Sequence, residues 1–171
     1  MRTRIGSFLL LGIIALSVHS ALGANPVLIQ IGSLSGTRGT NASIPISLAA
    51  STGTVVGVQV DLVFDTNRLQ LGSLPAACSL SAALQATHTL QAGSPAAPSP
   101  GSGFQRLRLL LYPQAGASAL VSSGQLASCT FLVKSTAPVG ASKVKAQLQE
   151  VSDGAGLKIF SKGIDGTLTV Q

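Results

Sequence analysis

The segment Val55–Leu71 limits most narrowly what this chain can fold into. Within it, large apolar residues occupy every second position and alternate with small or polar ones: Val56, Val58, Val60, Leu62 and Phe64. A period of two is that of a β-strand with one buried face. The strand ends at the turn signal Asp65–Asn67, and a short apolar return follows at Leu69 and Leu71. This segment predicts a strand, a turn and a second strand.

Most of the remaining chain shows the same alternation or a short apolar run. The further predicted strands are Val27–Ile31, Ser43–Ala49, Gln105–Tyr112, Gly124–Val133, Ser142–Val151, Leu157–Phe160 and Thr167–Val170. Turn residues separate them, and the alanine-rich segment Ser79–Gln91 fits either a short helix or a strand. About nine strands with regular turn signals predict an all-β fold, a single antiparallel β-sandwich with jelly-roll topology.

The first 23 residues have the composition of a secretory signal peptide. Arg2 and Arg4 precede the apolar run Phe8–Leu16, and small residues follow at 21–23. We therefore expect a signal peptide over residues 1–23 and one domain over residues 24–171, secreted to the periplasm or the cell exterior. A retained N-terminal anchor is the alternative. The run is short for a transmembrane helix, so we expect no stable membrane insertion after cleavage.

The charge of the chain excludes an obvious nucleic-acid interface. Removing Arg2 and Arg4 lowers the formal net charge from +6 to +4, and no run of lysine or arginine remains. Nucleic-acid binding domains concentrate such residues on one face. We expect no nucleic-acid partner.

The two cysteines, Cys78 and Cys129, both follow the predicted signal peptide. Two cysteines in an exported protein most simply form a disulfide, and two separate buried thiols are the alternative. Closing a loop of about 50 residues stabilises a fold by roughly 4 kcal/mol in the chain-entropy model.

Residues for catalysis or metal binding are sparse. The chain has five carboxylates, and Asp61 and Asp65 on one strand face lie about 13 Å apart along the backbone, too far for an acid–base pair. His88 has no serine–histidine–aspartate context. Asp65, Asp153 and Asp165 are candidate calcium ligands without a clustered motif. We predict a non-enzymatic protein with no metal and no cofactor, and keep a small hydrolase as a remote alternative.

Five segments in order resemble a cohesin domain. They are the opening VLIQIG, then SIPISL, VGVQVDLVFDTNRLQL, GQLASCTFLVKSTAPVGASKVKAQ and the closing GIDGTLTV. The chain departs from the family pattern at Thr66, where cohesins usually carry a proline, and in its cysteine pair. The resemblance covers Pro26–Val170 and implies a nine-stranded jelly roll related to carbohydrate-binding modules.

The resemblance also implies a function and a surface. Cohesins bind dockerin modules in polysaccharide-degrading assemblies, through the outer face of the sheet that holds their third, fifth, sixth and eighth strands. Carried onto this chain by strand count, that face holds Gly57, Gln59, Asp61, Arg106, Arg108, Ser128 and Thr130. Asp61 with either arginine is a candidate cross-strand charge pair. We expect this face to bind a protein partner that carries a dockerin.

Direct binding of polysaccharide is the alternative function. Flat sugar-binding faces usually use tryptophan or tyrosine rings. This chain has no tryptophan and one tyrosine, Tyr112, while Phe64 and Phe131 lie on predicted core faces. The residues therefore favour a protein partner over a polysaccharide.

Overall fold

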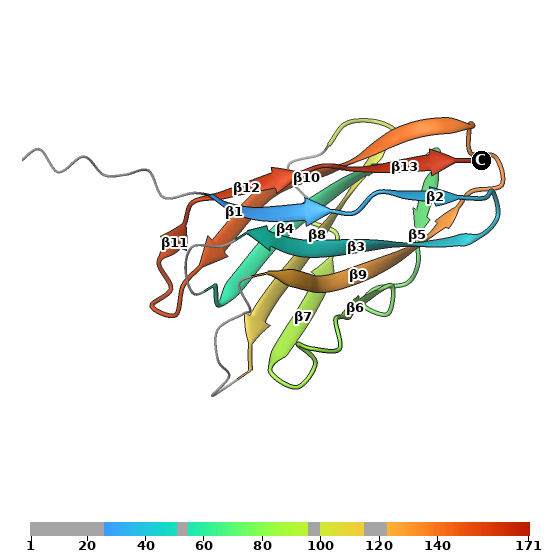
Figure 1. Ribbon diagram of the computed structural model, residues 1–171. Helices are drawn as coiled ribbons and strands as arrows, with labels where there is room; N and C mark the ends of the chain where they lie inside the picture. The colour runs from blue at the N-terminus through green and yellow to red at the C-terminus, as the bar shows by residue number, and fades with distance from the viewer. Residues whose placement is uncertain (1–25, 51–54, 96–99, 115–122) are drawn as a thin grey trace, which may run out of the picture.

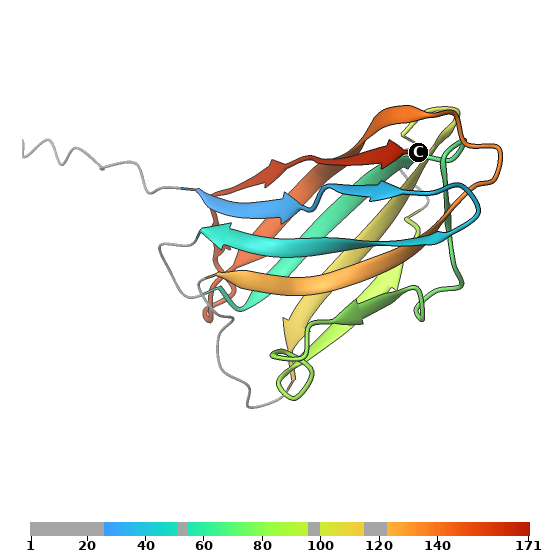
Figure 2. The ribbon, with the colours of Figure 1, turned by 45° about the vertical axis from the view of Figure 1, so that its right-hand side comes forward.

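The computed structural model describes residues 26–50, 55–95, 100–114 and 123–171, which form strands and connecting turns (Figure 1). The predicted signal peptide, residues 1–23, lies outside them. The described part contains no helix long and apolar enough to span a membrane. Its strands form two sheets that lie face to face (Figure 2). The predicted β-sandwich is therefore confirmed.

The first sheet holds six strands in the order β12-β1-β3-β9-β5, with β6 also paired to β9. Their bounds are β12 Ser161–Ile164, β1 Val27–Ile31, β3 Asn41–Ala50, β9 Gly124–Val133, β5 Leu69–Leu71 and β6 Cys78–Leu80. Pairing is antiparallel except between β1 and β12, which run parallel at the edge.

The second sheet holds seven strands in the order β2-β13-β10-β4-β8-β7, with β11 paired to β10. Their bounds are β2 Leu34–Gly36, β13 Gly166–Val170, β10 Gly140–Ser152, β4 Gly57–Asp65, β8 Phe104–Pro113, β7 His88–Gly93 and β11 Lys158–Ile159. Here too the pairing is antiparallel, except between β2 and β13.

The predicted strands all appear, and the described residues add β2, β6, β7 and β12. The ambiguous segment Ser79–Gln91 is not a helix: it ends β6, passes through turns and enters β7. Pairing explains this outcome. Cys78–Leu80 takes its partners from β9, and His88–Gly93 takes its partners from β8, so the sheets override the helix propensity of the alanines.

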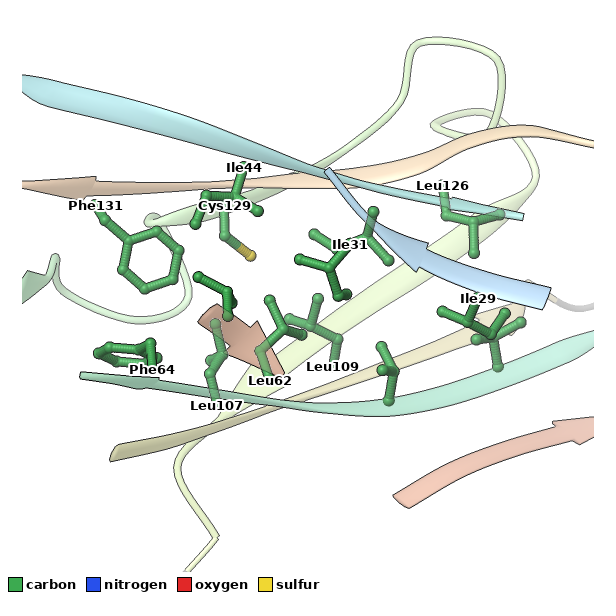
Figure 3. Packing of buried hydrophobic residues seen from close by; sticks show 14 of the residues in the cluster. Ile29, Ile31, Ile44, Leu62, Phe64, Leu107, Leu109, Leu126, Cys129 and Phe131 are labelled. Carbon is green, nitrogen blue, oxygen red and sulfur yellow. The ribbon is translucent and has the colours of Figure 1, made fainter. Parts of the chain in front are cut away.

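The core lies between the two sheets and is built from the alternating residues of both. Leu62 and Phe64 of β4 face Ile44 of β3 and Phe131 of β9 (Figure 3). The rings of Phe64 and Phe131 meet edge to face, with centroids 4.9 Å apart. Each such fully buried side chain stabilises the fold by about 1.5–3 kcal/mol. Val58, Val60, Leu62 and Phe64 are thus core, as predicted. The prediction for Val56 is wrong: Val56 is half-buried, and its neighbour Val55 is the buried residue at the start of the segment.

Cys78 and Cys129 form a disulfide, as predicted, so the alternative of two separate thiols is wrong. The two cysteines are register partners on β6 and β9, with their Cα atoms 4.1 Å apart. The bond joins residues 51 positions apart and fastens the short strand β6 to the first sheet.

Candidate functional site

The outward side chains of β7, β8, β4 and β10 form a continuous surface that we call the charged face. Its central row runs from Arg108 on β8 through Asp61 on β4 to Gln147 on β10. The next row holds Leu110, Gln59 and Glu150. Because cross-strand neighbours on one face contact one another, each row brings side chains together that are far apart in the sequence.

Asp61 and two arginines make the centre of this face. Arg108 donates from Nε to Asp61 Oδ1 at 2.7 Å and from Nη2 to Oδ2 at 2.9 Å. Arg106 approaches Asp61 Oδ2 with Nη1 at 3.5 Å and donates from Nη2 to Gln147 Oε1 at 3.4 Å. The predicted cross-strand charge pair is confirmed, with both arginines taking part.

The exposure of the three side chains differs sharply. The Asp61 side chain is 0% exposed and that of Arg106 is 5% exposed, whereas that of Arg108 is 34% exposed. The side-chain hydrogen bond to Asp61 raises the pKa of Arg108 and outweighs the opposite effect of burial. Arg108 is thus held in one orientation by a buried carboxylate while part of its guanidinium stays open to solvent. An arginine fixed in this way is positioned to donate hydrogen bonds to an acceptor on a partner.

The structure corrects the predicted role of Asp61. It points away from the core, as the alternation requires, but it lies under the two arginines instead of meeting solvent. The reason is length: arginine side chains on the neighbouring strand reach over a short aspartate and cover it. Asp61 is therefore a positioning residue on this face, and Arg108 is the accessible one.

Gly57, Gln59, Arg106 and Arg108 lie on the charged face as expected. Ser128 and Thr130 do not, and their predicted place on it is wrong. Both lie on β9, in the first sheet, and they alternate with Ala127, Cys129 and Phe131, which are buried. They therefore face outward on the opposite side of the sandwich. The neighbours of β4 in the sheet are β8 and β10. The strand count taken from the sequence assigned the position of β10 to β9.

Residues of the charged face that were missed include Gln147, Glu150 and Tyr112. The first two lie on β10, and an irregularity between Gln147 and Glu150 shifts the register there. Without that β-bulge, Glu150 would stand opposite Val58 and point to the core; with it, Glu150 stands opposite Gln59 and faces out. The signal was present in the sequence, because the alternation of Ser142–Val151 breaks between Leu148 and Val151.

Metal binding gains no support from the described residues, in which no group of three or more histidine, cysteine, aspartate or glutamate residues gathers. The three candidate calcium ligands accept backbone amides instead, two of them in turns and one from β10. Asp65 accepts from Asn67 N and pairs with Arg68, and Asp153 accepts from the amides of residues 155 and 157. Asp165 accepts from the amide of residue 146.

His88 begins β7 and is buried, with 3% of its surface exposed. Its Nδ1 lies 2.8 Å from Thr87 Oγ1, while Nε2 is buried and makes no hydrogen bond to the described residues. Burial lowers the pKa of His88 below its ordinary value. No carboxylate contacts this ring within the described part of the chain, so His88 has the surroundings of a core residue.

Comparison with known proteins decides the family. A model of the cohesin domain matches residues 27–170. The chain belongs to the cohesin family. A cohesin domain is a non-catalytic binding module, so the prediction that the chain is not an enzyme is confirmed. No curated protein matches the sequence.

Solved cohesin structures share this fold at low sequence identity. The sixth cohesin of Acetivibrio cellulolyticus scaffoldin B, solved with a mutant Cel5 dockerin, is 15% identical, with a TM-score of 0.64; the match covers 86% of this chain and 100% of that one. The Clostridium thermocellum complex Coh-OlpA-Doc918 gives 14% identity, coverage of 86% and 100%, and a TM-score of 0.65. A non-cellulosomal cohesin from the archaeon Archaeoglobus fulgidus gives 16% identity, coverage of 86% and 92%, and a TM-score of 0.64.

Proposed function

We propose that this cohesin domain uses the charged face to bind a dockerin. The dockerin is carried by a protein that takes part in polysaccharide degradation. The observation that carries the proposal is the Arg108–Asp61–Arg106 cluster in the middle of the second sheet. Related cohesins have been solved in complexes with dockerins, which supports the class of partner.

The charged face has the layout of a protein interface. Arg108 uses Nε and Nη2 on Asp61, so its Nη1 donors point to no acceptor among the described residues. Beside Arg108, a shallow hollow between β7 and β8 is bordered by Gln91, Pro95 and Leu110. In protein interfaces a few side chains contribute most of the binding energy, and arginine is often among them. An arginine held in one orientation beside an apolar depression is typical of such a side chain. A partner carbonyl or carboxylate would accept from Arg108 while an apolar side chain fills the hollow.

The test is calorimetric titration of the domain with dockerin modules from the same organism. We expect Arg108→Ala to weaken the affinity at least about thirtyfold, as for other central interface residues. Gln91→Arg adds bulk to the hollow without removing a contact and should also weaken binding. The matched control is Thr130→Arg, an exposed strand residue on the opposite face, which should bind like the unmodified domain.

Two results would contradict the proposal. One is that no dockerin of the organism binds the correctly folded domain. The other is that Thr130→Arg abolishes binding while Arg108→Ala and Gln91→Arg do not. Urea unfolding of each variant separates a loss of binding from a loss of fold.

We also propose that the domain is exported and that residues 1–23 are removed. The positively charged, then apolar leader supports this, as does the disulfide, because such bonds persist in oxidising compartments. Mass spectrometry of the protein from its source should find a mature N-terminus near residue 24 outside the cytoplasm. A cytoplasmic protein that retains Met1 would contradict this part of the proposal.

A further inference from the structure

A second hollow lies at the other end of the charged face, where β8, β4 and β10 meet the turn before β11. Its volume is about 310 Å³, at the lower end of the range for small-molecule sites. The side chains that matter are those of Tyr112, Gln59, Glu150, Ser152 and Lys158. Tyr112, near the end of β8, is 40% exposed and so offers its ring to solvent.

The polar groups of this hollow are largely unused by the protein. Gln59, Ser152 and Tyr112 make no side-chain hydrogen bond to any described residue. Glu150 accepts one bond, from Lys158 Nζ at 3.3 Å, and both partners are more than half exposed. An amide, two hydroxyls and an incompletely paired carboxylate therefore converge beside one aromatic ring.

Two local features create this arrangement. The β-bulge in β10 turns Glu150 to the outer face, opposite Gln59. Gly57 leaves room for the hydroxyl of its register partner Ser152, because a Cβ at that position would lie 2.6 Å from Ser152 Oγ. The bulge also brings Val151 opposite Val58 in the core, so one irregularity sets a core contact and the outer surface together.

We propose that this hollow binds a short stretch of a neutral, hydroxyl-rich sugar chain. The apolar faces of pyranose rings stack on aromatic rings, and their neighbouring hydroxyls pair with carboxylate, amide and hydroxyl side chains. Glu150 and Lys158 balance each other in charge, which favours a neutral ligand over an acidic one. This inference goes beyond dockerin binding and does not depend on it.

The chain supplies its own reporter for the test. Tyr112 is its single tyrosine and there is no tryptophan, so tyrosine emission reports on this hollow alone. Cellopentaose, xylopentaose and maltopentaose are titrated separately, with emission and heat recorded. At least one should give a saturable change with a dissociation constant of about 1 mM or lower, as fits a shallow open site.

Three variants and one control locate the binding. Tyr112→Ala should weaken the sugar affinity measured by calorimetry at least about tenfold. Gln59→Ala and Glu150→Gln should each weaken that affinity severalfold. The control is Phe104→Ala, since Phe104 is exposed on the same face of β8 but lies outside the hollow. It should bind like the unmodified domain.

The inference is overturned if none of the three oligosaccharides binds the folded domain. It is also overturned if Phe104→Ala loses affinity as Tyr112→Ala does, which would indicate non-specific stacking. Dockerin titrations of the same preparations keep the two proposals apart. If the domain binds a dockerin and none of the sugars, only this inference is refuted. If it binds a sugar and no dockerin, only the proposed function is refuted.

Discussion

The two outer faces of this sandwich share one core and differ in almost everything else. In the first sheet, β1, β3, β5, β6 and β9 contain no charged residue, and the edge strand β12 holds one, Lys162. Strands β4, β8 and β10 of the second sheet carry the Asp61 cluster, the Lys143 and Lys145 side chains and Glu150. The first sheet is crosslinked by a disulfide, and the second by partly buried hydrogen bonds between ions. Equal inward patterns thus leave the outward residues free to specialise.

This contrast distinguishes the inward residues, which stabilise the fold, from the outward residues, which are available for binding. Inward residues are set by burial and are much alike in both sheets. An ion cluster in the second sheet is not required for stability, because a buried ion pair is often no better than a well-packed apolar set. Charge concentrated on one sheet therefore points to recognition, and the following predictions test the two faces against each other.

Removing the disulfide should have the greatest effect on stability. We expect Cys78→Ser with Cys129→Ser to lower the free energy of unfolding by about 4 kcal/mol, as the chain-entropy model gives for a loop of this length. The measurement is urea denaturation. The neighbouring Ser128→Ala, on the same strand, should change it by less than about 0.5 kcal/mol. Equal effects of the two changes would contradict the role of the disulfide.

Removing Asp61 should be nearly as costly on the second sheet. Asp61→Ala leaves Arg106 with a buried charge and no carboxylate, so we expect a loss of about 3 kcal/mol in denaturant unfolding. Because the cluster acts as a unit, Asp61→Ala with Arg106→Ala should cost less than the sum of the single changes. Additive losses would mean that the cluster is only a set of independent surface contacts.

Acidification should weaken the fold through His88. Burial lowers its pKa in the folded state, so below about pH 6.5 the unfolded chain binds a proton that the folded chain does not. Stability is then full above the unfolded pKa and falls as the pH drops toward the folded one. The melting temperature of His88→Gln should vary less over this window. An identical pH profile for both proteins would contradict the assignment.

Breaking an exposed ion pair should have the smallest effect. Lys143 and Asp165 lie 3.8 Å apart and both are open to solvent. Lys143→Ala should change the free energy of unfolding by less than about 0.5 kcal/mol, and salt should reduce even that. A loss as large as that of Asp61→Ala would show that burial does not distinguish the two pairs.

The sequence predicted the fold well because period-two alternation reports burial directly, as at Val58, Leu62 and Phe64. It placed Gln59, Arg106 and Arg108 on one face because register follows from that pattern. It misplaced Ser128 and Thr130, since which strand lies beside β4 depends on pairing between distant segments. The burial of Asp61 could not be predicted from the sequence, because it depends on how the side chains of Arg106 and Arg108 cover Asp61 in the folded sheet.

The most direct test of the account is hydrogen–deuterium exchange of the domain with and without a bound dockerin. The account predicts added protection on β4, β8 and β10, centred on Arg108, with β3 and β9 unchanged. Protection on β3 and β9 around Thr130, with the charged face unchanged, would contradict it.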